Sequence, residues 1–141
     1  MALKIFLDSD VVISSLISNL GAAYLLIHST KDLERFISNL SLKELEEVAP
    51  RLNLDRNSFL NLVKANLKTL ELETTNIKLK EKYKDYVLDP DDAHILAGAI
   101  EGKVKFLISY NIRHYKVDKI RKDFNMFILT PGHFIQYLRS I

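Results

Sequence analysis

The sequence contains no cysteine, which excludes a disulfide framework, a thiolate metal site and a cysteine nucleophile. Glycine and proline are scarce, with four and three residues among 141, so we expect short loops and many helices. No apolar run approaches the roughly 18 residues that a membrane span needs. The start of the chain lacks a signal-peptide pattern because Lys4 and Asp8 interrupt it. These absences predict a cytoplasmic protein that does not enter a membrane.

A large excess of charge of one sign is also lacking, since the formal net charge is only +2. This balance does not indicate a strongly basic nucleic-acid binder, although it is compatible with a local basic patch. Hydrophobic residues make up 48% and charged residues 27%, which is typical of a globular protein. The length suits one ordinary core, and we find no linker or internal repeat. We therefore predict a single domain over residues 1–141.

A strand-like stretch near the N-terminus ends in two acids. Residues 3–7 are mostly apolar, and Asp8, Ser9 and Asp10 follow them. A short apolar run with polar borders is typical of a strand that is buried on both faces in a parallel sheet. In open α/β sheets, ligands bind beyond the carboxyl ends of the strands, which is where we expect Asp8.

Strand-like and helix-like stretches alternate along the rest of the chain. We expect further strands at residues 33–38, 104–109 and 126–129, with helices between them and a terminal helix from residue 131. Ser41 and Glu44 have the spacing of a capping box, so we expect one helix to begin at Ser41. The alternation predicts an α/β fold with a central parallel sheet flanked by helices on both faces.

Oxygen-bearing side chains at strand ends and helix starts are predicted to meet at one edge of this sheet. They are Asp8, Glu44, Asp92 and Asn111. Carboxylates that lie close together repel one another unless a cation offsets their charge. Mg²⁺ and Mn²⁺ prefer such oxygen ligands and promote hydrolysis of phosphodiester bonds. The alternative is that Glu44 only caps its helix and that Asp92 only interacts with a helix dipole.

The ordered set of motifs resembles the PIN-domain ribonucleases, in particular the VapC-type toxins of prokaryotic toxin–antitoxin pairs. That family opens with a strand ending in Asp, then a small hydroxylated residue and a helix, which matches residues 5–13. It has an acid in a later helix, which matches Glu44, and a third acid before small helical residues, which matches Asp92. Its last motif is a strand, then Thr or Ser, a variable residue and Asp. Here Asn111 stands in place of that Asp.

The resemblance implies a metal-dependent endoribonuclease that uses Mg²⁺ or Mn²⁺, forms a homodimer and is inhibited by a small antitoxin. It implies four catalytic residues: Asp8, Glu44, Asp92 and Asn111. Of these, Asp8, Glu44 and Asp92 are the implied metal ligands. Asn111 offers only a neutral carbonyl oxygen, so it weakens one ligand and leaves the number of metals open.

Secondary roles are assigned to other polar residues nearby. Ser9 and Ser109 either hydrogen-bond a ligating carboxylate or cap the elements they flank. We interpret Asp10 as structural, and the spacing to the small helical residues favours Asp92 over Asp91 as the third acid. Three residues after Asn111 are candidates for holding RNA phosphates, or form a solvated face: Arg113, His114 and Lys116.

Two other functions stay open at the level of sequence. The Asp-x-Asp pattern of residues 8–10 also fits haloacid-dehalogenase-like phosphatases, in which Asp8 is a nucleophile that forms an aspartyl-phosphate. The chain is short for that fold, and its later acids precede a helix instead of following a strand. The Asn at position 111 makes a non-catalytic RNA-binding domain the other alternative. Cleavage of RNA that requires Mg²⁺ or Mn²⁺ distinguishes the three.

Overall fold

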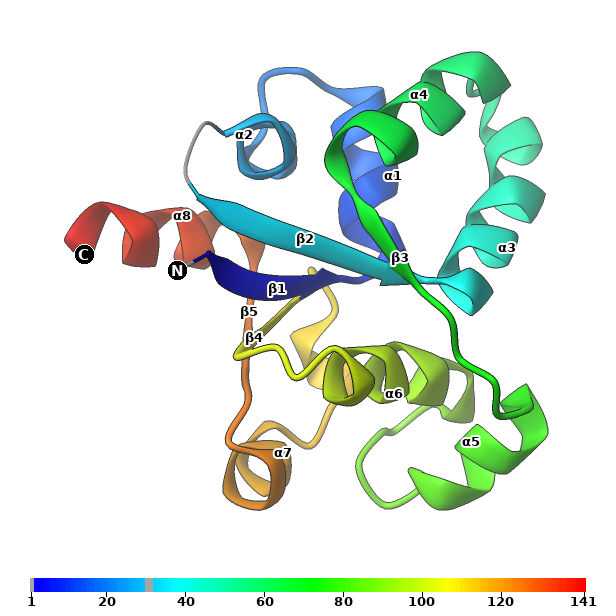
Figure 1. Ribbon diagram of the computed structural model, residues 1–141, viewed down its shortest axis with the longest axis vertical. Helices are drawn as coiled ribbons and strands as arrows, with labels where there is room; N and C mark the ends of the chain where they lie inside the picture. The colour runs from blue at the N-terminus through cyan, green and yellow to red at the C-terminus, as the bar shows by residue number, and fades with distance from the viewer. Residues whose placement is uncertain (1, 30–31) are drawn as a thin grey trace.

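A computed structural model describes residues 2–29 and 32–141 and contains a five-stranded sheet (Figure 1). The strands are β1 (Leu3–Leu7), β2 (Leu33–Ser38), β3 (Lys68–Leu70), β4 (Phe106–Ile108) and β5 (Phe127–Leu129). Neighbouring strands are parallel, and their order is β3-β2-β1-β4-β5. The predicted parallel sheet is confirmed, and β3 at its edge is an additional strand. Residues 1, 30 and 31 of the predicted domain lie outside the described residues.

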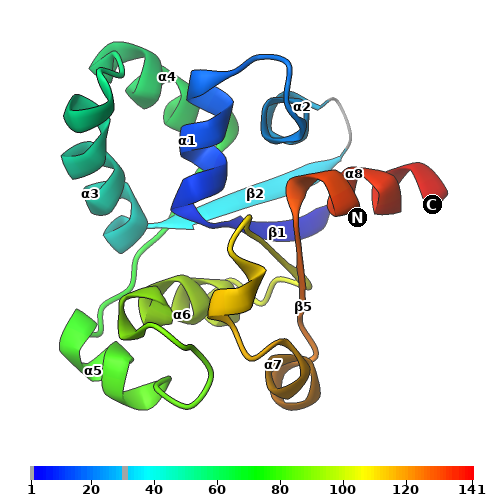
Figure 2. The same cartoon turned by 180° about the vertical axis from the view of Figure 1, so that it is seen from behind.

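Helices connect the strands and cover both faces of the sheet, as predicted (Figure 1 and Figure 2). One face carries α1 (Ser9–Ile17), α2 (Ala22–His28), α3 (Asn39–Val48), α4 (Arg56–Asn66) and α8 (Pro131–Ser140). The other carries α5 (Asn76–Lys82), α6 (Ala93–Glu101) and α7 (Val117–Phe124). Short 3-10 turns are η1 (Ala49–Leu52), η2 (Pro90–Asp92) and η3 (Ile112–His114). No single helix in the described part of the chain is long and apolar enough to cross a membrane, and the α1–α2 pair reaches such a length only across a 100° bend.

Successive residues of the central strand β1 enter two separate hydrophobic cores. Ile5 and Leu7 belong to the core under α1, α2, α4 and α8, whereas Phe6 belongs to the core under α6. All three side chains are fully buried, which explains why β1 is a nearly continuous apolar run. Because both faces are packed, the end of β1 and the residue after it are held in a fixed position.

Helix α6 packs unusually close to β1. Gly98 lies against the ring of Phe6, and a Cβ atom at position 98 would overlap that ring. Ala97 and Ala99 beside it are buried, so small side chains line this contact. The close approach fixes the distance between β1 and the start of α6, where Asp92 is the N-cap residue.

Helix α3 begins two residues earlier than predicted. Ser38 is its N-cap, and the Ser38 hydroxyl accepts a hydrogen bond from the Ser41 N–H at 3.0 Å. The predicted capping box at Ser41 is therefore wrong, because the last residue of β2 caps the helix directly. Glu44 consequently lies in the second turn of α3, and its carboxylate contacts a residue of another helix, His94.

Candidate acidic site

Asp8 lies at the carboxyl end of β1, where the order of the strands reverses. The chain continues from β1 to β2 and β3 on one side, whereas β4 and β5 lie on the other side. Crevices at such switch points are the usual ligand sites of open α/β sheets. The Asp8 N–H donates to the Ile108 carbonyl at 2.9 Å, which ties the end of β1 to the end of β4. The two motifs at residues 8–10 and 109–111 therefore meet.

The Asp8 carboxylate is buried, with 7% of the residue exposed, and two hydroxyls hold it. Ser109 Oγ donates to Asp8 Oδ2 at 2.8 Å, and Tyr115 Oη donates to the same oxygen at 3.0 Å. Burial raises the pKa of Asp8, and this effect outweighs the lowering by the two hydrogen bonds. Burial and the surrounding acids also raise the pKa of Tyr115, which stays a protonated donor. Both partners of Asp8 are neutral, so they orient its charge without cancelling it.

Asp10, in the first turn of α1, faces the motif that follows β4. Its Oδ2 accepts hydrogen bonds from the Tyr110 N–H and from Asn111 Nδ2, both at 3.1 Å. Its Oδ1 is buried and has no hydrogen-bond partner among the described residues. Burial and the nearby Asp8 raise the pKa of Asp10 to about 7. The side-chain amide of Asn111 thus directs its nitrogen towards an acid.

Asp92 approaches the site from the start of α6. Its side chain makes no capping bond to that helix, and instead Asp92 Oδ2 lies 3.0 Å from His114 Nδ1. Burial and the charge of Asp8 raise the pKa of Asp92 to about 6, although His114 lowers it. The neighbouring Asp91 forms an ion pair with Lys80 at 3.0 Å, on the surface. The structure therefore gives the two adjacent acids different surroundings.

Glu44 on α3 pairs with His94 on α6. His94 Nε2 lies 3.2 Å from Glu44 Oε2, and this contact lowers the pKa of Glu44. The His94 ring is buried, with 4% exposed, and its Nδ1 has no hydrogen-bond partner in the described part of the chain. The Glu44 charge also raises the pKa of Asp8, so the two carboxylates interact at a distance.

The site residues predicted from the sequence relate to Asp8 in different ways: through a direct contact, through another residue, or through their charges alone. Asp8 contacts Ser109 directly, whereas Asn111 reaches the site through Ser109, whose Oγ accepts the Asn111 N–H at 3.0 Å, and through Asp10. Asp92 and Glu44 interact with Asp8 through their charges. The remaining residues lie beside the site: Ser9 is buried and lowers the pKa of Glu44, His114 bonds to Asp92, and Arg113 and Lys116 are exposed.

The acidic side chains around Asp8 suit a cation by their chemistry, although they do not form a preassembled cage. Among residues 2–29 and 32–141, no three or more His, Asp or Glu side chains form a ready-made metal-binding group. The chemistry nevertheless fits a hard cation, because Asp8 raises the pKa of both Asp10 and Asp92. No Lys or Arg of the described residues pairs with any of these three acids. Oxygen ligands with uncompensated negative charge are what Mg²⁺ and Mn²⁺ bind.

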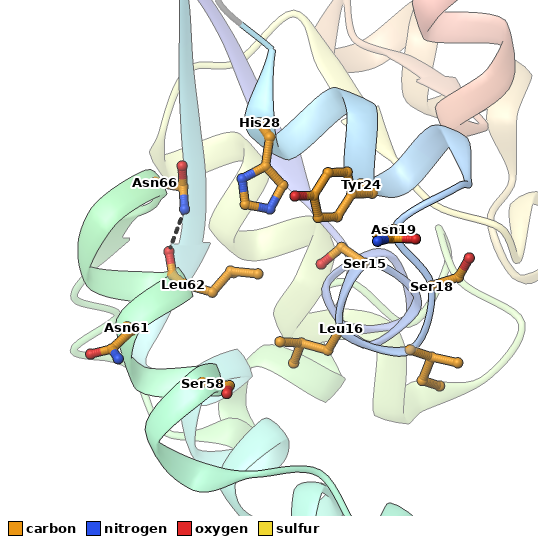
Figure 3. A pocket seen from close by; sticks show the side chains of 11 residues that line it. Ser15, Leu16, Ser18, Asn19, Tyr24, His28, Ser58, Asn61, Leu62 and Asn66 are labelled. Carbon is orange, nitrogen blue, oxygen red and sulfur yellow. Dashed lines mark hydrogen bonds between the residues drawn. The ribbon is translucent and has the colours of Figure 1, made fainter.

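A cavity of about 760 Å³ lies apart from the acids, between α1, α2 and α4 (Figure 3). Tyr24 and His28 lie side by side in its wall, with ring centroids 4.1 Å apart. Most other lining side chains are neutral and polar: Ser15, Ser18, Asn19, Ser58, Asn61 and Asn66. No carboxylate lines this cavity, so it does not offer the ligands of a hard cation.

Comparisons with known proteins report a family and a fold. A family model described as "PIN domain" matches residues 4–113, an interval that contains all four predicted catalytic residues. Among solved structures, the crystal structure of VapBC2 from Rickettsia felis bound to a DNA fragment from its promoter is similar, with a TM-score of 0.60. The match has 15% sequence identity and covers 91% of this chain and 98% of the matched chain, so it speaks for the fold alone. None of the curated proteins compared matches the sequence.

Proposed function

The chain belongs to the PIN-domain family, because the family model spans most of its length, and on that premise we propose that it is an endoribonuclease dependent on Mg²⁺ or Mn²⁺. The observation that carries the proposal is the group of carboxylates around Asp8 at the switch point of the sheet, which have no Lys or Arg partner among the described residues. Family membership also confirms the PIN-domain resemblance, and the match to VapBC2 agrees with its VapC-type part. Membership of the PIN-domain family speaks against the haloacid-dehalogenase-like phosphatase alternative.

In this proposal Asp8, Asp92 and Glu44 hold the cation, and Asn111 lies beside them. The cation, when bound, supplies charge neutralisation at phosphorus and lowers the pKa of the attacking water. Ser109 and Tyr115 fix the Asp8 carboxylate in one orientation, so little rearrangement is needed when the substrate binds. His114 orients Asp92 in the same way. The exposed cationic side chains of Arg113 and Lys116 are suited to bind RNA phosphates next to the acids.

Cleavage of RNA by the purified protein tests this proposal. We expect cleavage with Mg²⁺ or Mn²⁺, none with EDTA, and a loss of more than about 100-fold in Asp8→Asn, since a ligand should matter more than its supporting partners. Asp118→Asn is the matched control, because Asp118 is exposed and lies in α7. Circular dichroism should show that both variants fold. Metal-independent cleavage, or full activity of Asp8→Asn, would contradict the proposal, and RNA binding without cleavage would favour the non-catalytic alternative.

We further propose that the protein is the toxin of a toxin–antitoxin pair, acts in the cytoplasm, binds a small antitoxin and forms a homodimer. The support is the similarity to a chain of the VapBC2 structure. Ile17, which lines the cavity between α1, α2 and α4, is 65% exposed, and Leu20 and Leu25, which follow it in sequence, are 92% and 47% exposed; exposed apolar side chains of this size favour a protein contact. Co-purification with the product of an adjacent small gene tests the antitoxin. A monomer mass by light scattering at tens of micromolar would contradict the dimer.

A further inference from the structure

We propose that Asp10 replaces the acid that is missing at position 111, and that Asn111 is the positioning residue that orients it. The inference rests on the proposed function, because it assigns another carboxylate to the same cation site. The last motif of the family has Asp where this chain has Asn111. Asp10 comes from the other end of the sequence, after β1, and the fold brings it into contact with that position.

The contact between Asp10 and Asn111 determines which atoms face each other. Asn111 Nδ2 donates to Asp10 Oδ2 at 3.1 Å across 101 residues of sequence, and the Tyr110 N–H donates to the same oxygen. An amide nitrogen carries only donors, so this end of Asn111 repels a cation and attracts a carboxylate. Both bonds reach one oxygen, so they hold the Asp10 carboxylate in a single orientation and leave its other oxygen without a donor.

That other oxygen, Asp10 Oδ1, is buried without a hydrogen-bond partner among the described residues. A buried polar atom with no partner is costly, and an unseen ion or water is a common explanation for one. The adjacent Ser9 is only 6% exposed, and its hydroxyl interacts with the Glu44 carboxylate and lowers the pKa of that group. The unsatisfied Asp10 oxygen, two residues after Asp8, therefore points to a ligand in the acidic site.

Asp10 also acts electrostatically as a member of this site. Burial raises the pKa of the Tyr115 hydroxyl, and the charges of Asp8, Asp92 and Asp10 raise it further, so all three carboxylates act on the hydroxyl that donates to Asp8. With Asp10 included, the site contains four carboxylates, and the charge lost at position 111 is restored. If Asp10 only fastened α1 to the end of β4, its charge would be dispensable for cation binding.

An exchange of the two residues separates these roles. Asp10→Asn keeps the shape and an acceptor for the Tyr110 N–H but removes the charge, so we expect about 10- to 100-fold weaker Mn²⁺ binding by calorimetry. The double variant Asp10→Asn with Asn111→Asp returns one acid and one amide to the pair in reversed order. We expect it to recover most of the Mn²⁺ affinity. Melting temperatures in EDTA and in Mn²⁺ provide a second readout, since a bound ion stabilises the folded state.

Two comparison variants make the outcomes distinguishable. Asp8→Asn should abolish Mn²⁺ binding, and Asp118→Asn should leave it unchanged. If Asp8→Asn loses Mn²⁺ but Asp10→Asn binds it as tightly as the wild type, the inference is overturned and the proposed function stands. Failure of the double variant to recover affinity, with its fold intact in EDTA, also overturns the inference. If the wild type binds no Mn²⁺, the cation site of the proposed function falls, and the inference falls with it.

Discussion

The acids that follow β1, Asp8 and Asp10, differ from Glu44 on α3 in the groups that contact their carboxylates and in the direction of their pKa shifts. Asp8 and Asp10 receive hydrogen bonds from hydroxyls, an amide and a backbone N–H, and burial raises the pKa of both. Glu44 instead contacts His94, which lowers its pKa. Neutral donors fix the direction of a carboxylate without removing its charge. Among the described residues, the strand-end acids Asp8 and Asp10 therefore have no cationic side-chain partner, whereas Glu44 has a basic partner within the protein.

Asp92 shows whether burial beside Asp8 or contact with a histidine has the larger effect on the pKa of an acid in this site. It has a histidine partner, His114 at 3.0 Å, yet burial and the charge of Asp8 raise its pKa to about 6. A histidine contact therefore does not by itself decide the direction in which the pKa moves. The two acids differ in the effect that is largest, which is burial for Asp92 and the hydrogen bond with His94 for Glu44.

The largest expected effect is a difference in RNA cleavage between Asp92→Asn and Glu44→Gln. Burial and the charge of Asp8 raise the pKa of Asp92 despite its contact with His114, so we expect its variant to lose more than about 100-fold in rate. The contact with His94 lowers the pKa of Glu44, so its variant should lose about 10-fold. Initial rates with saturating Mg²⁺ measure both losses. Equal losses would mean that the opposite pKa shifts of the two acids do not distinguish them in the working site.

A second prediction concerns the packing of α6, which carries His94 and follows Asp92, against β1, which ends at Asp8. Gly98→Ala places a Cβ atom where the Phe6 ring lies, so α6 must move away from β1, and we expect a loss of about 1–3 kcal/mol in stability. Gly132→Ala is the control, because no atom lies within 4 Å of its added Cβ and its helical position favours Ala. Urea unfolding measures both. A neutral Gly98→Ala would contradict the close packing.

The smallest effect is on stability against pH in EDTA. The pKa values of Asp10 and Asp92, about 7 and about 6, lie above the unfolded value of 3.8, so the native state binds protons that the unfolded state does not. Stability from these groups should therefore rise by about 1 kcal/mol as pH falls from 8 to 5, after allowance for partial exposure. The lowered pKa of Glu44 acts only at more acidic pH.

Asp10→Asn provides the control for this pH dependence. Removing a group with a raised pKa should stabilise the metal-free protein at pH 8 more than at pH 5. Melting temperatures of the wild type, Asp10→Asn and Asp118→Asn at both values measure the difference. If Asp10→Asn changes stability equally at the two pH values, Asp10 does not titrate in this interval.

The sequence predicts the central strands better than the edge of the sheet. β1 and β4 are apolar because both of their faces are buried, and such runs can be recognised without knowing their neighbours. β3 has two exposed residues of three and pairs with β2 through its backbone, so side-chain patterning carries no signal for it. The start of α3 was predicted wrongly because Ser38 and Ser41 are both suitable caps, and the end of β2 decides between them.

The acids of the site are predictable from their motifs, but the residues that hold them are not. Tyr115 is separated from Asp8 by 107 residues, and His94 is separated from Glu44 by 50. Only the packing of β4 and of α6 against β1 and α3 creates these contacts. For these supporting contacts, the only signal in the sequence is the acidic pattern of residues 8–10, and from sequence alone we interpret Asp10 as structural. Its unsatisfied oxygen is visible only in three dimensions.

The place of β1 in the sheet has a consequence for synthesis of the chain. Of the five strands described, β1 leaves the ribosome first, yet it lies in the middle of the sheet, and one of its two neighbours, β4, begins at Phe106. Pairings between such distant segments are slow, since loop closure must precede them. Asp8 acquires Ser109 and Tyr115 only after a further 101 and 107 residues have been made. A nascent chain that stops before Tyr115 therefore has Asp8 but no assembled site, so any hydrolytic activity must wait for the segment that follows β4.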